Sequence, residues 1–184
     1  MNPYKVIIPA RIKLALDKLN GAGHEAYIVG GCVRDSLLGR EPTDWDITTS
    51  AIPERIKEVF NGYKQVDTGL KHGTVTVILE GEPVEVTTYR IDGRYSDGRR
   101  PDTVFFTEDI AGDLARRDFT INACAMTESE LVDPFGGEQD IRDGRIRCVG
   151  DPRERFREDA FRILRGIRFA SVLGFKVEEK TKEA

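Results

Sequence analysis

The chain has 184 residues, of which 39% are hydrophobic and 33% charged, and its formal net charge is −4. That length suits one ordinary domain with a short appendage, and the composition is typical of a globular protein. No apolar run reaches the roughly 20 residues of a membrane-spanning helix, and the N-terminus lacks the pattern of a signal peptide. The three cysteines, Cys32, Cys124 and Cys148, are widely spaced and lack a zinc pattern, which predicts packed, reduced thiols. We therefore expect a cytoplasmic protein that does not enter a membrane.

The acidic average hides clusters of arginine. Arg116 and Arg117 are adjacent, and nine arginines lie between positions 142 and 168. Any one of these could be a solvated arginine offset by a neighbouring acid. Arginine in such numbers nevertheless suits recognition of phosphates and bases, because its planar guanidinium donates several hydrogen bonds at once.

Residues 9–22 are predicted to form the first helix. Pro9 suits its first turn, and Ile12, Leu16 and Leu19 recur with helical spacing on one face. We expect this face to pack against the body of the protein.

The next segment has the pattern of an apolar strand at 26–29, a turn at Gly30 and Gly31, and a short helix that carries Arg34 and ends near Gly39. A glycine pair lets backbone N–H groups approach a phosphate at a helix start. Arg34 adds positive charge one turn later. The segment is therefore predicted to bind phosphate, although a glycine pair alone often marks a simple turn.

Asp44 and Asp46 follow at the start of a second predicted strand. Residues two apart in a strand point to the same face, so we expect their carboxylates to lie side by side. Such a pair is unfavourable unless a cation neutralises it, and a hard divalent ion such as Mg²⁺ prefers oxygen ligands. An isolated Asp-x-Asp can also be a solvated loop. The combination with the glycine turn favours a phosphate and metal site.

Residues 30–48, GGCVRDSLLGREPTDWDIT, resemble the signature of the class II tRNA nucleotidyltransferases, or CCA-adding enzymes, and of the related bacterial poly(A) polymerases. The resemblance implies an α+β, polymerase-beta-like head with a mixed sheet of about five strands flanked by helices. It divides the chain into a catalytic head at 1–150 and the start of a helical neck at 151–184. It also assigns Gly30, Gly31 and Arg34 to nucleotide binding, and the two aspartates to catalysis and metal binding.

A β-hairpin is predicted from Thr74–Leu79, a turn at residues 80–83 and a return strand over 84–89. Glu85 lies between Val84 and Val86 in the return strand, where an acid needs a partner or a polar face. Either it points to a polar sheet face, or it is a third catalytic carboxylate beside the two aspartates. The segment EVTTYR resembles the family segment that supplies such an acid, which favours the second alternative.

Residues 91–102 show no periodicity and are predicted to be a mobile loop, either a disordered connector or a functional segment. The similar family segment takes part in the change from C to A addition. Its presence therefore favours CCA or A addition. The following RRDFTINA, residues 116–123, is specific to the superfamily and implies that Arg117 and Asn122 contact the nucleotide.

One long helix is predicted from Pro152 to Leu173, with an apolar face of Phe156, Ala160, Ile163, Leu164 and Ile167. Its residues EDAFR, 158–162, resemble the family motif that reads the base, so Asp159 and Arg162 become candidate base contacts. Helical neighbours three apart can also form a simple ion pair. Arg165 and Arg168 are nucleotide contacts by resemblance, although helical geometry would place Arg168 opposite Asp159.

These expectations combine into one reaction, the transfer of a nucleotide from CTP or ATP to the 3′ end of tRNA with release of pyrophosphate. Two Mg²⁺ ions held by Asp44, Asp46 and Glu85 would assist it. The alternatives are a poly(A) polymerase, an enzyme that adds only A, or a nucleotide-binding module without turnover. Family members continue beyond this length, so tRNA binding by the chain alone is expected to be weak.

Overall fold

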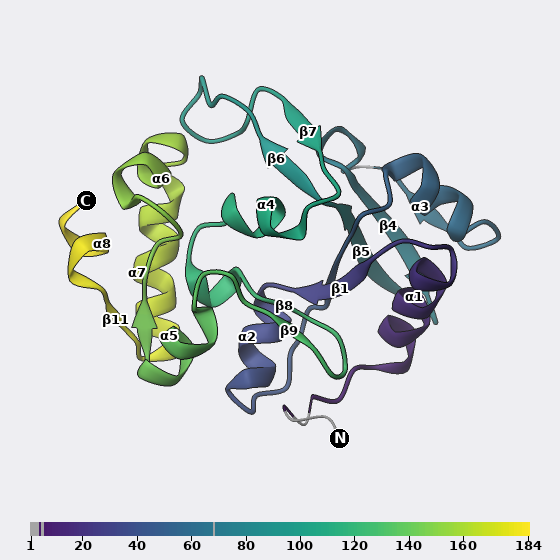
Figure 1. Cartoon of the computed structure of the whole chain (residues 1–184), viewed down its shortest axis with the longest axis horizontal. Coiled ribbons are helices and arrows are strands. Elements are labelled where there is room, and N and C mark those ends of the chain that lie inside the picture. Colours follow the sequence, from purple (N-terminus) through teal and green to yellow (C-terminus); the bar gives the residue numbers. More distant parts are fainter. Residues whose placement is uncertain (1–3, 5, 68) are drawn as a thin grey trace.

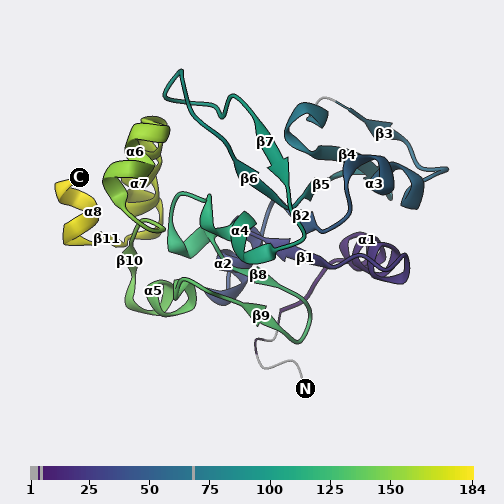
Figure 2. The same ribbon diagram turned by 45° about the horizontal axis from the view of Figure 1, so that its top comes forward.

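The structure is a computed structural model that describes residue 4, residues 6–67 and residues 69–184. Within this part, one sheet contains β1 (Ala26–Val29), β2 (Asp46–Thr49), β3 (Gln65–Val66), β4 (Thr74–Leu79), β5 (Glu82–Thr88), β8 (Ala125–Met126) and β9 (Leu131–Val132). Its strand order is β3-β4-β5-β2-β1-β8-β9 (Figures 1 and 2). The pair β2 and β5 is parallel and the other neighbours are antiparallel, so the sheet is mixed. The predicted α+β class is confirmed, with seven strands rather than about five because two-residue strands extend both edges.

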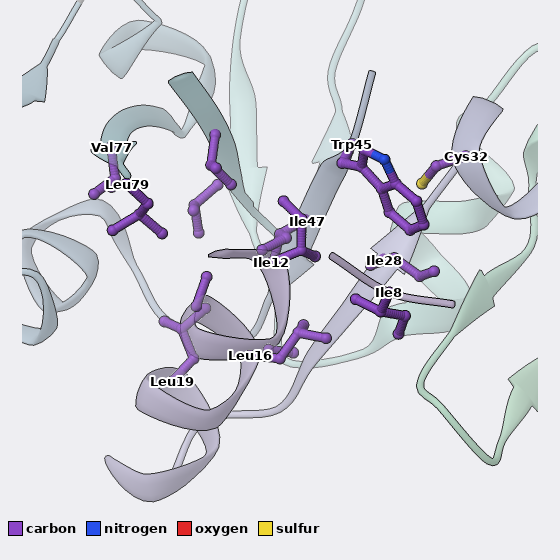
Figure 3. Close-up of a cluster of buried hydrophobic side chains, with 14 of the residues drawn as sticks. Ile8, Ile12, Leu16, Leu19, Ile28, Cys32, Trp45, Ile47, Val77 and Leu79 are labelled. Atoms are coloured by element: carbon purple, nitrogen blue, oxygen red, sulfur yellow. The ribbon is translucent and has the colours of Figure 1, made fainter. Parts of the chain in front are cut away.

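One face of the sheet is covered by α1 (Ala10–Gly21) and α3 (Pro53–Val59), and together they enclose the main apolar core. The predicted stripe of α1 is buried, and Figure 3 shows Ile12 beside Ile47 of the sheet, with Leu16 and Leu19 in the same cluster. The opposite face carries α4 (Ile110–Ala115), whose Leu114 belongs to a second, smaller core.

The alternation of side chains along β2 and β5 places the polar residues on that second face. Ile47 and Val86 are fully buried in the main core, whereas Asp46 and Glu85, which are partners in the parallel register, are exposed. Because adjacent residues of a strand point to opposite faces, both carboxylates lie on the face opposite α1.

The remaining elements surround this face. They are α2 (Gly31–Leu37), α5 (Gly137–Asp143), α6 (Pro152–Glu158), α7 (Phe161–Leu173), α8 (Glu179–Glu183), the 3-10 turns η1 (Leu70–His72) and η2 (Thr120–Asn122), and the strand pairs β6 (Arg90–Asp92) with β7 (Val104–Phe106) and β10 (Arg145–Ile146) with β11 (Lys176–Val177). Figures 1 and 2 place α6, α7 and α8 at the end of the molecule away from α1 and α3.

The predicted hairpin is present, but its turn is shorter than expected. Glu80 and Gly81 both have positive φ, 53° and 84°, as in a two-residue turn of type I′. The return strand therefore begins at Glu82 instead of residue 84. Pro83 is accommodated because it pairs only with Ile78, while β2 first meets β5 at Glu85. Its missing N–H thus removes no bond to β2.

The predicted loop at 91–102 is partly a hairpin. Its first residues belong to β6, which pairs with β7, and Gly93 and Asp102 extend the ladder with backbone bonds of 2.8 Å to Thr103 and Arg94. Sequence periodicity could not reveal strands of only three residues.

The single helix predicted over 152–173 is wrong. Asp159 is extended, with φ −144° and ψ 104°, and separates α6 from α7. Its Oδ1 accepts the backbone N–H of Phe161 at 2.9 Å, so it caps the second helix. Asp159 and Arg162 are therefore not neighbours three apart within one helix.

The apolar face predicted for this region is not buried. Ile163, Leu164 and Ile167 are 44%, 60% and 61% exposed. The inward residues of α7 are Arg162 and Gly166, and a Cβ at Gly166 would lie 3.0 Å from the Phe119 ring. Gly166, rather than the predicted apolar stripe, therefore packs against Phe119.

The expectation of packed thiols is confirmed, because all three cysteines are buried and free. Burial raises the pKa of Cys32 to about 11 and that of Cys148 to about 12, so both stay protonated at neutral pH. In the described part of the chain, no helix has the length and apolar character needed to span a bilayer.

Candidate active site

A cavity of about 620 Å³ lies between the polar face of the sheet and the segment that begins at Asp159 and continues through α7. It gathers residues from the β1–α2 turn, β2, β6, the segment after α4, and α7. Of the residues predicted from sequence, the structure brings together Gly30, Gly31, Arg34, Asp46, Arg117, Asn122, Asp159, Arg162, Arg165 and Arg168. Asp44 and Glu85 do not line it. Arg168, expected from helical geometry to face away from Asp159, lies with it in the same cavity because the helix is broken between them.

The cavity is strongly positive although the chain is acidic. Its lining includes nine arginines and four aspartates, whereas the whole chain has a net charge of −4. Clefts lined by one sign of charge concentrate ligands of the opposite sign. The site is therefore suited to a polyanion such as a nucleoside triphosphate.

A pair of carboxylates stands beside the arginines. Asp46, the first residue of β2, is in register with Glu85 of β5. Asp44 was expected within the strand, but it is exposed in the irregular segment that precedes β2, where the Thr43 hydroxyl donates to it at 3.4 Å. The strand begins after Asp44 because Asp46 is the first residue that pairs with β1.

The surroundings of Asp46 raise its pKa. Its side chain faces the open cavity, yet the surrounding protein removes part of its hydration, and this desolvation raises the pKa of Asp46. The Glu85 carboxylate adds to the rise, Arg117 opposes it, and Asp44 contributes a smaller rise. Excess negative charge at this point would be relieved by a bound cation.

The donor set fits a divalent metal. Asp46 and Glu85 supply oxygen atoms, which hard divalent cations prefer, and such sites commonly use only one or two carboxylates together with substrate phosphates. Within the described ranges, no three His, Cys, Asp or Glu side chains are already arranged to hold a metal ion.

Arg117 connects the carboxylates to the glycine turn. Its Nη1 would lie 3.4 Å from a Cβ placed on Gly30, whose φ is +80°. The Nε of Arg117 is buried and lacks a hydrogen-bond partner among the residues that the structure describes. An incoming acceptor could satisfy this donor after a small movement of the side chain.

Arg34 is held in a fixed orientation. It donates to Asp35 at 2.8 and 3.0 Å and to Oδ1 of Asn122 at 2.7 Å. Asn122 in turn donates to Asp118 at 3.4 Å, and Asp118 accepts from Arg165 at 2.6 Å. The predicted residues Arg34, Asn122 and Arg165 thus form one polar network along the cavity.

The side chains of Asp159 and Arg162, the two candidate base contacts, bond to different partners. Arg162 is buried and donates to Glu158 at 2.7 Å and to the backbone carbonyl of Arg116 at 3.2 Å. The salt bridge of Arg162 is with Glu158, not Asp159. The simple helical ion pair between Asp159 and Arg162 is therefore wrong, and the Asp159 carboxylate is available to the cavity.

Sequence reasoning missed several lining residues, namely His72, Arg90, Asp92, Tyr95, Arg99, Arg100, Arg116, Asp118 and Phe169. Arg116 and Asp118 lie within the quoted RRDFTINA and could have been added from it. Asp92 and Tyr95, joined by a hydrogen bond of 2.7 Å, fall where no periodicity was visible.

Gly30→Ala is expected to lower the free energy of unfolding by about 1–3 kcal/mol, because a side chain is strained in this backbone region. Gly31→Ala is the matched control: Gly31 lies inside α2 without a positive φ, and its Cβ would meet only Nη2 of Arg34 at 3.6 Å. It should leave stability unchanged or raise it by up to about 1 kcal/mol. Urea unfolding of both variants tests this; equal losses would contradict it.

Comparison with known proteins identifies the family. The sequence model described as the poly A polymerase head domain matches residues 26–147. A CCA-adding enzyme of Lactobacillus helveticus is 54% identical over 170 residues, covering 92% of this chain and 42% of that protein. One from Enterococcus faecalis is 51% identical over 184 residues, covering 100% and 44%.

Solved structures agree. The CCA-adding enzyme of Bacillus stearothermophilus in complex with CTP has a TM-score of 0.86 and 44% identity, covering all of this chain and 43% of that one. The Thermotoga maritima enzyme complexed with tRNA has a TM-score of 0.76 and 31% identity, covering 96% and 41%. The chain thus spans less than half the length of these relatives. On its sequence, fold and site, the chain belongs to the poly A polymerase head domain family, which includes CCA-adding enzymes.

Proposed function

We propose that this chain is the catalytic portion of a tRNA nucleotidyltransferase that adds CCA, using CTP and ATP. The observation that carries the proposal is the meeting of an arginine-rich cavity with a carboxylate pair, of which Asp46 lines the cavity and Glu85 lies beside Asp46 in the register of the sheet. The first suits a triphosphate and the second a divalent cation. The relatives named as CCA-adding enzymes, one of them solved with CTP and one with tRNA, support the choice of substrates.

In this proposal the chain's own residues bind and orient the nucleotide. Gly30, Gly31, Arg34 and Arg117 hold the triphosphate and sugar, while Asp159 and Arg162 read the base. With its α-phosphate fixed near Asp46, the nucleotide is attacked by the tRNA 3′-hydroxyl. The new phosphodiester bond forms as the bond to pyrophosphate breaks.

The metal in this proposal is Mg²⁺, held by Asp46 with Glu85 and Asp44. When bound, two such ions would lower the pKa of the attacking hydroxyl and neutralise the charge on the departing pyrophosphate. Asn122, Arg165 and Arg168 complete the nucleotide site as further nucleotide contacts, and Asn122 also accepts a hydrogen bond from Arg34.

We also propose that residues 1–150 form the catalytic head and residues 151–184 begin a helical neck. The family match ends at residue 147, and α6 and α7 follow it. The two parts are not independent, because β11 pairs with β10 across the division. A cytoplasmic location follows from the proposed work on tRNA.

A single assay tests the reaction. The chain is incubated with tRNA lacking its CCA end and with CTP and ATP, singly and together. CCA addition predicts two C residues from CTP alone and a completed end only with both nucleotides. A ladder of A from ATP alone would indicate a poly(A) polymerase, and a single A on tRNA ending in CC, without C addition, an A-adding enzyme. Binding of CTP without incorporation would support a nucleotide-binding module.

The chain alone is expected to hold tRNA weakly, with a Kd in the micromolar range or above that is typical of non-specific binding, roughly 10⁻⁴–10⁻⁶ M. Nucleic-acid affinity depends largely on phosphate contacts, and the relatives are more than twice as long as the part matched here. Anisotropy of labelled tRNA at physiological salt measures this, with the longer Enterococcus faecalis enzyme as control. Nanomolar affinity for the chain alone would contradict the prediction.

A further inference from the structure

Asp113 lies in α4 with a side chain that is fully buried. Its Oδ1 accepts Nε and Nη2 of Arg116 at 3.0 and 2.7 Å and the backbone N–H of Arg90 at 3.3 Å. Its Oδ2 accepts Nη2 of Arg117 at 3.0 Å and the Thr48 hydroxyl at 3.3 Å. One carboxylate thus joins two arginines to β2 and β6.

Asp113 itself is not part of the cavity lining, although Arg90, Arg116 and Arg117 are. Burial acts to raise the pKa of Asp113, but the guanidinium groups of Arg117 and Arg116 outweigh it and hold the pKa below its ordinary value. The carboxylate is therefore ionised, and it compensates the charge of two arginines that face the ligand.

We propose that Asp113 is a positioning residue for the phosphate-binding arginines, above all Arg117. This inference rests on the proposed function, because it assumes that Arg117 meets a nucleotide phosphate. An arginine side chain that must be ordered on binding costs conformational entropy. Asp113 removes much of that cost by fixing the guanidinium beforehand, and its bonds to Thr48 and to the backbone of Arg90 fix the carboxylate in turn.

The same chain contains a matched control. Asp140 is also buried, at 2% exposure, and accepts Nε of Arg147 at 2.8 Å and the Thr120 hydroxyl at 2.6 Å. Arg145 is a third, looser partner at 3.7 Å, and none of these three residues lines the cavity. Loss of Asp140 should therefore lower the stability of the fold, as breaking a buried ion pair does, without acting on nucleotide binding.

The experiment compares Asp113→Asn and Asp140→Asn with the wild type, using equilibrium binding of CTP and CMP in Mg²⁺. Asp113→Asn is expected to raise the Kd for CTP about 10-fold to 100-fold, by analogy with the loss of a hydrogen-bond partner that orients a metal ligand. The Kd for CMP should change less, because most of the triphosphate charge is absent. Asp140→Asn should change neither Kd, although both variants lose thermal stability.

A double-mutant cycle with Arg117→Gln separates positioning from general structure. If Asp113 acts through Arg117, Asp113→Asn should have little further effect on the Kd for CTP in the Arg117→Gln background. An unchanged Kd in the single variant, or an equal loss in both backgrounds, overturns the inference. Should Asp113→Asn fail to fold, Arg116→Gln is compared with the double variant Asp113→Asn/Arg116→Gln. Removing Arg116 as well leaves one positive charge fewer without its carboxylate. If the wild type binds CTP no better than CMP, the proposed function fails instead.

Discussion

Asp46→Asn is expected to abolish nucleotide incorporation in a protein that remains folded. The substitution keeps the volume of the side chain and removes one charge from the pair with Glu85. Lewis-acid stabilisation by a metal supplies several kcal/mol, so the rate of incorporation should fall by about a thousandfold or more. The magnesium dependence of CTP affinity should also be reduced, which can be measured even if the chain alone turns over slowly.

A control for Asp46→Asn is Glu82→Gln. Glu82 is exposed and lies in the same strand as Glu85 but pairs with Leu79 at the hairpin turn. It should retain wild-type incorporation and wild-type magnesium dependence. Near-normal turnover by folded Asp46→Asn protein in magnesium would remove Asp46 from the proposed metal site.

The same substitution should increase stability at neutral pH. In the folded protein the pKa of Asp46 is raised, first by desolvation and then by Glu85. The folded state therefore binds this proton more tightly than the unfolded chain, and ionisation of Asp46 costs stability as the pH rises through that pKa. The difference in free energy of unfolding between variant and wild type should be near zero at about pH 3, below the ordinary aspartate pKa of about 3.9, and positive at neutral pH. Urea unfolding across this range measures it.

Local signals in the sequence predicted local structure well. The strand Thr74–Leu79 was predicted with the bounds that the structure has, because it is rich in β-branched residues and Glu80-Gly81 marks the turn. The stripe of α1 was likewise readable from helical spacing, and all its residues are buried. In both elements the pattern depends on neighbours within one turn or one hairpin.

Contacts between residues far apart in the sequence were harder to predict. Asp46 and Glu85 meet through a parallel pairing of β2 with β5, which no local pattern reveals, and only the family resemblance suggested it. Asp113 looks in the sequence like an ordinary acid in the first turn of a short helix. Its partners Thr48 and Arg90 come from distant parts of the chain, and only Arg116 and Arg117 are near it in sequence.

The break at Asp159 was missed for a physical reason. Apolar residues continue with helical spacing on both sides of it, so periodicity predicts one helix. The aspartate nevertheless uses its carboxylate to cap the helix that follows it. Asp side chains compete with the helical hydrogen bonds of the backbone, so they are favoured at helix starts and disfavoured inside helices. This break is also what brings Asp159 and Arg168 into one cavity.

The consequence of that geometry is a testable account of base selection. Cytosine and adenine each present an exocyclic amino donor beside a ring-nitrogen acceptor, whereas uracil and guanine present a carbonyl beside an N–H. A carboxylate only accepts hydrogen bonds and a guanidinium only donates them. Asp159 facing the amino group and Arg162 facing the ring nitrogen would therefore accept C and A and reject U and G.

Asp159→Ala is expected to weaken binding of CTP and ATP and to reduce the preference over UTP and GTP by about tenfold or more, since hydrogen bonds to charged groups contribute roughly 1.5–3 kcal/mol. Asp159→Asn should keep an oxygen for the N–H of Phe161 while offering a donor to a carbonyl, so it should favour UTP further. Asp151→Ala is the control, because Asp151 caps α6 through Arg153 but lies outside the cavity. Equilibrium binding of all four nucleotides measures the effect. If the preference for C and A survives Asp159→Ala undiminished, or falls equally in Asp151→Ala, Asp159 is only a helix cap and selection depends on other residues.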